Sequence, residues 1–271
     1  MLLDSQALEA FLHELADASE QVVLRYFRIG LEVEDKSDES PVTQADREAE
    51  QALRELIQER FPAHGIFGEE HGHLGPEREW QWILDPIDGT RAFVSGLPLF
   101  GTLIALTHQG SLQLGLLNLP ALGERWWSTS GNLAQHRQTR PHLQTRTCQT
   151  SRKQDLASCY AYSTDPSMFS EAQWHQVKQV YRSVKMRRFG GDCYSYGLLA
   201  SGHIDLVLEA DLKLYDIAGP MAVVEASGGR VTDWRGNSPL EPGWDGTVLA
   251  SASRELHQLA LNQLTLVENS E

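Results

Sequence analysis

The segment Trp80–Gly96, WQWILDPIDGTRAFVSG, constrains the fold of this chain more than any other. Its apolar start predicts a buried strand, and because proline has no N–H for a sheet ladder, we expect the strand to end at Asp85-Pro86. Asp85 and Asp88 should then lie at a strand end beside Gly89, where backbone N–H groups can approach an anion. Two carboxylates alone would repel a phosphate, so a hard divalent cation between them is the consistent interpretation. The alternative is an Asx-turn with two solvated aspartates.

Composition excludes several classes of protein. The 271 residues carry a net charge of −14, with 37 acidic against 23 basic side chains and no basic stripe, so we expect no nucleic-acid partner. No apolar stretch reaches membrane-spanning length, and the N-terminus does not have the pattern of a secretory signal. Cys148, Cys159 and Cys193 form an odd set without metal-ligand spacing, which is typical of reduced thiols. A soluble cytoplasmic protein without membrane contact is expected.

The first half of the chain predicts helices that cover a mostly antiparallel sheet. Leu8 to Phe27 has helical periodicity, and Thr43 is a plausible N-cap for a second helix with Asp46 in its first turn. A short strand should precede Glu69 and Glu70. Residues 100–106 and 112–117 predict a hairpin, with a third strand at 125–128. The polar stretch 131–155 is interpreted as the crossover between two halves.

The second half predicts alternating strands and helices. Ser170 and Gln173 resemble a capping box, and Asp216 is placed as the N-cap of a helix. The expected strands cover 158–163, 186–189, 203–209, 230–234 and 248–252, and the expected helices cover 170–180, 193–200, 217–227 and a segment starting at 255. We expect two parts: residues 1–145, an α+β half with most metal ligands, and residues 146–271, an α/β half with the substrate-recognition residues and Asp216.

Each acidic position also has a purely structural interpretation. Asp46 could simply complement a helix dipole, the paired glutamates at 69 and 70 could be solvated, Glu209 could be plain surface, and Asp216 could be only a cap. The sequence has no P-loop, no G-x-S-x-G and no H-E-x-x-H, so nucleotide, serine-hydrolase and zincin chemistry are not indicated.

Taken in order, the motifs resemble the inositol monophosphatase superfamily of Mg²⁺-dependent, lithium-sensitive phosphatases. The matching segments are VTQAD (42–46), GEE (68–70), DPIDGT (85–90), the glycine pair 190–191, Glu209 and YDIAG (215–219). The resemblance implies an α+β fold, a layered α-β-α-β-α sandwich of the inositol monophosphatase and fructose-1,6-bisphosphatase type, as a homodimer.

The resemblance also implies a role for each matching residue, with two or three Mg²⁺ ions per site. The metal ligands would be Glu69, Asp85, Asp88, Asp216 and the carbonyl of Ile87. Asp46 and Thr90 would hydrogen-bond one another and, with Glu69, orient the attacking water. Phosphate and substrate would contact the following residues: Asp88, Gly89, Thr90, Gly191, Asp192, Glu209 and Asp216.

Two stretches, 93–106 and 188–216, look like the histidinol-phosphate phosphatase subgroup. Gly191 and Asp192 stand where inositol phosphatases typically carry small residues, and Tyr215 stands where they have tryptophan. An extra carboxylate suits histidinol, which carries an ammonium, so Asp192 and Glu209 are expected to face that end of the substrate. Leu214 departs from the subgroup, whose members often have proline there. Inositol 1-phosphate or another sugar phosphate is the alternative substrate, and a non-catalytic regulator of the same fold is a more distant one.

Overall fold

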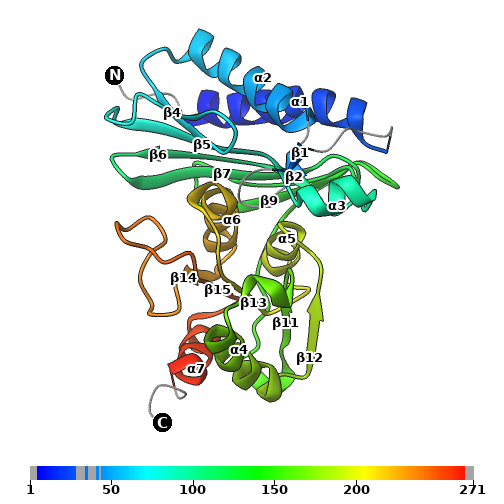
Figure 1. The fold of residues 1–271 in the computed structure, drawn as a ribbon, viewed down its shortest axis with the longest axis vertical. Coiled ribbons are helices and arrows are strands. Elements are labelled where there is room, and N and C mark those ends of the chain that lie inside the picture. The colour runs from blue at the N-terminus through cyan, green and yellow to red at the C-terminus, as the bar shows by residue number, and fades with distance from the viewer. Residues whose placement is uncertain (1–4, 29–33, 36–40, 43, 266–271) are drawn as a thin grey trace.

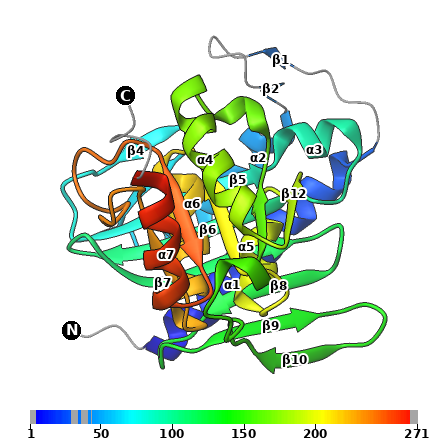
Figure 2. The ribbon, with the colours of Figure 1, turned by 90° about the horizontal axis from the view of Figure 1, so that it is seen from below.

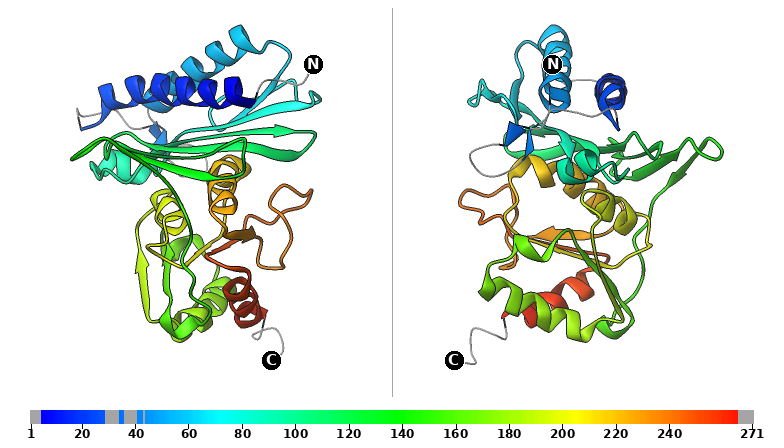
Figure 3. Two further views of the ribbon diagram at one scale, coloured as in Figure 1. Left: turned by 180° about the vertical axis from the view of Figure 1, so that it is seen from behind. Right: turned by 45° about the vertical axis from the view of Figure 1, so that its right-hand side comes forward.

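The computed structural model describes residues 5–28, 34, 35, 41, 42 and 44–265. These residues form five layers in the order helices, sheet, helices, sheet, helices (Figure 1). The view from behind in Figure 3 shows the same succession of layers. The predicted layered sandwich is therefore confirmed. None of the described helices combines the length and the apolar character that crossing a bilayer requires.

The first layer consists of two long helices, α1 (Ser5–Tyr26) and α2 (Gln44–Arg60). In α1 the buried side chains follow the three- and four-residue spacing of one helix face, among them Leu8, Phe11, Leu12 and Leu15. The ring of Phe11 packs edge-on against Trp82 of the sheet, with centroids 5.6 Å apart. The expected N-cap Thr43 lies outside the described residues. Between α1 and α2, two short strands, β1 (Glu34–Asp35) and β2 (Pro41–Val42), pair antiparallel.

The first sheet has eight strands, and every neighbouring pair is antiparallel except β3 and β5. The predicted hairpin and the third strand beside it are confirmed as β6, β7 and β8. In spatial order the strands are β10 (Gln144–Thr147), β9 (Ala134–Gln138), β8 (Glu124–Ser128), β7 (Ser111–Leu119), β6 (Gly101–His108), β5 (Trp80–Asp88), β3 (Gly65–Gly68) and β4 (Gly72–Leu74).

Residues 131–155, interpreted as the crossover between two halves, contain two strands that the sequence did not predict. Strands β9 and β10 lie there and extend the first sheet at one edge. The four residues of β10 are all exposed, and β9 buries only Ala134 and His136. His136 is held by stacking on Trp126, with ring centroids 4.1 Å apart, and by Glu124 at 3.0 Å. A strand fixed by such polar and aromatic contacts has no apolar alternation to reveal it.

Helices α5 (Tyr194–Ala200) and α6 (Leu214–Ala226) lie between the two sheets (Figure 1). Every residue from Ile217 to Val224 is buried, as expected for a helix covered on both sides. The close approach of α6 to the first sheet depends on Gly115 in β7. A Cβ at Gly115 would lie 2.5 Å from the Cβ of Ala222 and 2.6 Å from the carbonyl oxygen of Gly219.

The second sheet has five strands. In spatial order they are β12 (Met186–Phe189), β11 (Tyr160–Ser163), β13 (Leu206–Glu209), β15 (Val248–Ser251) and β14 (Arg230–Thr232). Helices α4 (Glu171–Ser183) and α7 (Arg254–Thr265) cover its outer face, toward the viewer in Figure 2. The capping box of α4 is confirmed, because Gln173 N–H donates to Ser170 Oγ and Ser170 N–H donates to Gln173 Oε1. Two 3₁₀ turns, η1 (Leu156–Ser158) and η2 (Pro166–Met168), flank β11.

Candidate active site

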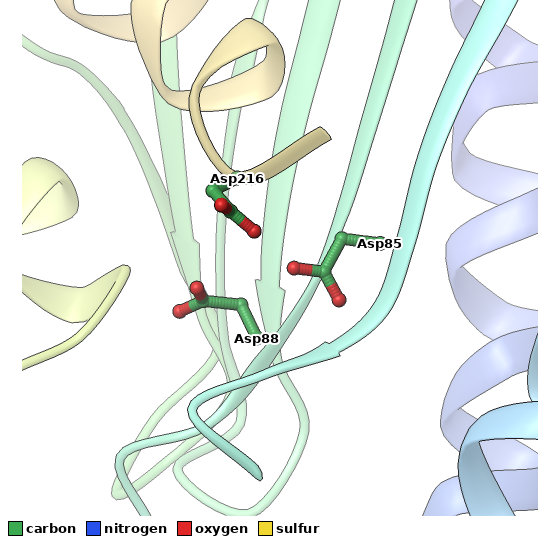
Figure 4. Close-up of side chains that lie close together, drawn as sticks. All are labelled: Asp85, Asp88 and Asp216. Carbon is green, nitrogen blue, oxygen red and sulfur yellow. The ribbon is translucent and has the colours of Figure 1, made fainter. Parts of the chain in front are cut away.

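The aspartates of the DPIDGT segment lie in a β-bulge, and the expected end of the strand at Pro86 is wrong. Asp85 pairs with Leu103 and Asp88 with Gly101, so β5 holds one residue more than β6 over this interval. Pro86 has no N–H to give to the ladder, and Thr102 Oγ1 instead donates to its carbonyl at 2.9 Å. In a regular strand, residues three apart face opposite sides of the sheet. The extra residue of the bulge lets both carboxylates face the same side (Figure 4).

Asp216 reaches the same place from the middle layer. It was expected to be the N-cap of its helix, but α6 begins earlier, with Lys213 as N-cap and Asp216 in the first turn. The Oδ2 atom of Asp216 accepts the N–H of Lys213 at 2.6 Å, and the N–H of Asp216 donates to the carbonyl of Lys213. This carboxylate therefore also stabilises the beginning of α6.

The three aspartates form a compact acidic cluster. One carboxylate oxygen from each of Asp85, Asp88 and Asp216 lies within 4.8 Å of the others (Figure 4). Burial, followed by the charges of neighbouring acids, raises the pKa of Asp85 and of Asp88 well above the usual value. Burial also raises the pKa of Asp216 to about 7. Within the described residues, Oδ1 of Asp85 is buried without a hydrogen-bond partner. A divalent cation fits this set, since it would neutralise the charges and accept that oxygen as a ligand.

Glu69 and Asp46 border the cluster. Glu69 follows β3, and its N–H donates to the carbonyl of Leu84 at 3.2 Å, next to Asp85. Its charge raises the pKa of Asp85 and of Asp216, although no oxygen of Glu69 belongs to the 4.8 Å group. Asp46 is buried in the first turn of α2 and also raises the pKa of Asp85, more weakly.

The turn after Asp88 leads into α3 (Thr90–Ser95). Gly89 has φ 80°, and a Cβ there would lie 3.1 Å from the carbonyl oxygen of Leu99 and 3.2 Å from Asp192 Cβ. Only glycine suits this position. The hydroxyl of Thr90 donates to the carbonyl of Ile87 at 3.1 Å, and the expected hydrogen bond between Thr90 and Asp46 stays a prediction. The side chain of Ile87 is buried, so only its carbonyl could serve the site.

Two further carboxylates, Asp192 and Glu209, lie near the aspartate cluster, and together they are called the second acidic wall. Asp192, at φ 43°, follows Gly190 and Gly191, and burial raises its pKa to about 6, whereas Arg91 lowers it. Glu209 ends β13 and accepts hydrogen bonds from Thr164 Oγ1 and Tyr196 OH, both at 2.5 Å. Burial nevertheless raises the pKa of Glu209 to about 7. Glu209 in turn raises the pKa of Asp216, which places the wall within electrostatic reach of the cluster.

Sequence reasoning missed the residues that orient this wall. Thr164 is the first residue after β11, and a polar residue at a strand end was a usable signal. Tyr196 and Cys193 had no such signal, since both lie in an apolar helical pattern. The Cys193 N–H, which donates to Asp88 at 2.7 Å, could not be foreseen from side-chain types.

Comparisons with known proteins agree with this fold. Residues 4–268 match the inositol monophosphatase family. The bifunctional phosphatase IMPL2, chloroplastic, of Arabidopsis thaliana is 41% identical over 92% of this chain and 72% of its own length. A histidinol-phosphatase of Chlorobaculum parvum is 35% identical over 95% of each chain. A solved inositol monophosphatase from Zymomonas mobilis superposes with a TM-score of 0.82 at 37% identity, over 94% of this chain and 96% of its own.

The layered fold, the acidic cluster and the whole-length match define a single class of protein. The chain belongs to the inositol monophosphatase family. The expected enzyme class, a phosphoric monoester hydrolase, is confirmed by this membership.

Proposed function

We propose that this chain is a Mg²⁺-dependent phosphatase that hydrolyses L-histidinol phosphate to L-histidinol and phosphate, a step of histidine biosynthesis. The observation that carries the choice of substrate is the second acidic wall: Asp192, which is half-buried, and Glu209, which is buried, are two carboxylates beside the aspartate cluster. A neutral polyol gives such groups no charge to balance, whereas the ammonium of histidinol does. The histidinol-phosphatase of Chlorobaculum parvum, 35% identical, supports the same choice.

The metal site would use Asp85, Asp88, Asp216, Glu69 and the carbonyl of Ile87, with two or three ions. Bound Mg²⁺ supplies charge neutralisation for the phosphate and a lowered pKa for a water molecule. The free oxygen of Asp85 and the mutual repulsion of the cluster are the observations that support these ligands. Lithium sensitivity is part of the same proposal.

The remaining residues bind and orient. The first N–H groups of a helix have no acceptor within it, so the backbone at Gly89 and Thr90 would donate to phosphate oxygens. Thr90 and Glu69, with Asp46 behind them, would orient the attacking water. Gly191 lets the chain approach the substrate, and Asp192 and Glu209 would bind its cationic end. No residue needs to become phosphorylated, because hydrolysis requires only positioning and charge neutralisation.

Inositol 1-phosphate is the second candidate substrate. The 41% identical IMPL2 is a bifunctional phosphatase, and the 37% identical structure is an inositol monophosphatase. A side-by-side measurement of kcat/KM on histidinol phosphate and inositol 1-phosphate tests the choice. A higher value on inositol 1-phosphate would contradict the proposal. A non-catalytic regulatory role is disfavoured by the assembled cluster, which a scaffold does not need.

A homodimer and a cytoplasmic location complete the proposal. Strand β12 is an edge strand whose four residues are all exposed, and Val94 in α3 and Leu97 just after it are exposed apolar side chains. Such edges and apolar residues favour association. The three cysteines are free and buried, as in a reducing compartment. Sedimentation equilibrium of the full chain tests the dimer, and a monomer at micromolar concentration would contradict it.

A further inference from the structure

The turn between β3 and β4, which carries Glu69, is held by a buried ion pair from α2. Glu50 is completely buried and Arg54 is 6% exposed. Their Oε1 and Nε atoms are 2.7 Å apart, one helical turn from each other along α2. Neither side chain belongs to the acidic cluster or to the wall around it.

The pair contacts the three residues that follow Glu69. Glu50 Oε2 accepts the N–H of Glu70 at 2.7 Å, and Glu50 Oε1 accepts the N–H of His71 at 3.1 Å. Arg54 Nη2 donates to the carbonyl of Gly72. The carboxylate thus has three donors, two of them backbone groups of the turn.

The residue before Glu69 is fixed by the same carboxylate. A Cβ at Gly68 would overlap the carboxylate of Glu50, so a larger residue there would have to displace that carboxylate from its present position. The N–H of Glu69 itself is bonded to Leu84 in β5. The backbone of Glu69 is therefore defined on both sides and connected to the residue preceding Asp85.

We infer that Glu50 and Arg54 are positioning residues of the hydrolase, which fix Glu69 against the aspartate cluster and thereby set the affinity for Mg²⁺. The inference rests on the proposed role of Glu69 as a metal ligand. Stability alone does not account for the pair, because an apolar pair of similar volume often stabilises a core as well as a buried ion pair does. Residues that orient metal ligands typically change metal affinity by 10- to 100-fold when they are replaced.

The first test is Glu50→Gln. Glutamine has the same size, but its amide nitrogen would face an N–H donor of the turn or the guanidinium of Arg54. We expect an equilibrium titration of the full chain to show Mg²⁺ affinity lowered by about tenfold or more. Excess Mg²⁺ should rescue turnover, and KM for the substrate measured there should stay within about twofold of wild type.

Asp205→Asn is the matched control. Asp205 has a buried carboxylate that accepts hydrogen bonds from the ammonium of Lys153 at 2.8 Å and from the N–H of Tyr160 at 2.7 Å. It lies just before β13, at the opposite end of that strand from Glu209. This variant should lose thermal stability and keep its Mg²⁺ affinity. If both variants lose stability and both keep wild-type Mg²⁺ affinity, Glu50 is only structural and the inference is overturned.

Arg54→Lys is a more conservative substitution, to be tested if the Glu50→Gln variant does not fold. Lysine keeps the charge but cannot reach both Glu50 and Gly72 with a fixed fork of donors. A smaller decrease in Mg²⁺ affinity supports the inference, and an unchanged affinity overturns it. If Mg²⁺ binding by this chain does not depend on Asp85, the proposed function is overturned instead, and the inference with it.

Discussion

Asp88 accepts a hydrogen bond from the backbone N–H of Cys193 at 2.7 Å, between residues 105 positions apart in the chain. The bond joins the end of β5 in the first sheet to the residue before α5 in the middle layer. It fixes the loop of Asp192 relative to the aspartate cluster. A carboxylate accepts at both oxygens, so this bond leaves Asp88 able to bind an ion.

Replacement of Asp88 by asparagine should abolish most activity. The amide removes one negative charge from the cluster and a ligand for the ion. Because even residues behind metal ligands typically contribute 10- to 100-fold, we expect kcat/KM to fall by about 100-fold or more. Phosphate release from histidinol phosphate at saturating Mg²⁺ measures this. Asp211→Asn, which removes an equal charge from an exposed side chain, should retain full activity; activity retained in Asp88→Asn would contradict the metal-site proposal.

Replacement of Asp192 by asparagine should discriminate between substrates. A hydrogen bond to a charged group contributes about 1.5–3 kcal/mol, so kcat/KM on histidinol phosphate should fall by about 10- to 100-fold. On inositol 1-phosphate, which has no ammonium, the change should be small. Equal losses on both substrates would show that Asp192 does not bind the cationic end.

The metal-free protein should become less stable as pH rises. The pKa of Asp216 is raised from 3.8 to about 7, and burial and neighbouring acids raise the pKa of Asp85 in the same direction. The folded state therefore keeps protons that the unfolded chain has released. This contribution to stability is fully present below about pH 4 and is lost as pH rises through about 7. Mg²⁺ binds the deprotonated carboxylates, so the increase in Tm on adding Mg²⁺ should grow over the same interval.

The difference in Tm with and without Mg²⁺ is the quantity to measure. Desolvation lowers the pKa of three histidines, His13, His64 and His257, to about 4, and these groups act in the opposite sense. Their stabilisation is present above about pH 6.5 and is lost as pH falls through about 4. Because they lie outside the cluster, they should cancel in the difference. A difference in Tm that is constant from about pH 5 to pH 8 would contradict the prediction.

Replacement of Gly115 by alanine should destabilise the contact between α6 and the first sheet. The new methyl group would overlap Ala222 and the backbone of Gly219. Overpacking of this kind costs typically about 1–3 kcal/mol in the free energy of unfolding, measurable by urea denaturation. Gly131→Ala is the control, since the nearest heavy atom to its Cβ would be 3.7 Å away. A variant at 115 as stable as the one at 131 would show that the layers can separate without cost.

The sequence predicted those features that depend on local patterns. The hairpin of β6 and β7 and the helix α1 have clear apolar periods, and Asp85 and Asp88 are close together in the chain. The convergence of Asp216 and Glu69 on them depends on long-range topology. It was expected only from the resemblance to a known family.

The errors have physical causes. Pro86 was expected to end its strand, but a bulge and the hydroxyl of Thr102 compensate for the missing N–H. Lys213 is an unusual N-cap, so the beginning of α6 was placed too late. Strands β9 and β10 have mostly polar side chains, and neither the pairing of β9 with β8 nor that of β10 with β9 is encoded in any periodicity of their own.

Asp216 has two roles, and this affects how relatives of this chain can be classified as active or inactive hydrolases. Its carboxylate completes the first turn of α6, so a descendant that no longer hydrolysed anything would still benefit from keeping it. Asp85 is different: its buried Oδ1 has no protein partner among the described residues and is a liability without an ion. An acidic residue at position 85 is thus a better indicator of hydrolase activity than an acidic residue at position 216.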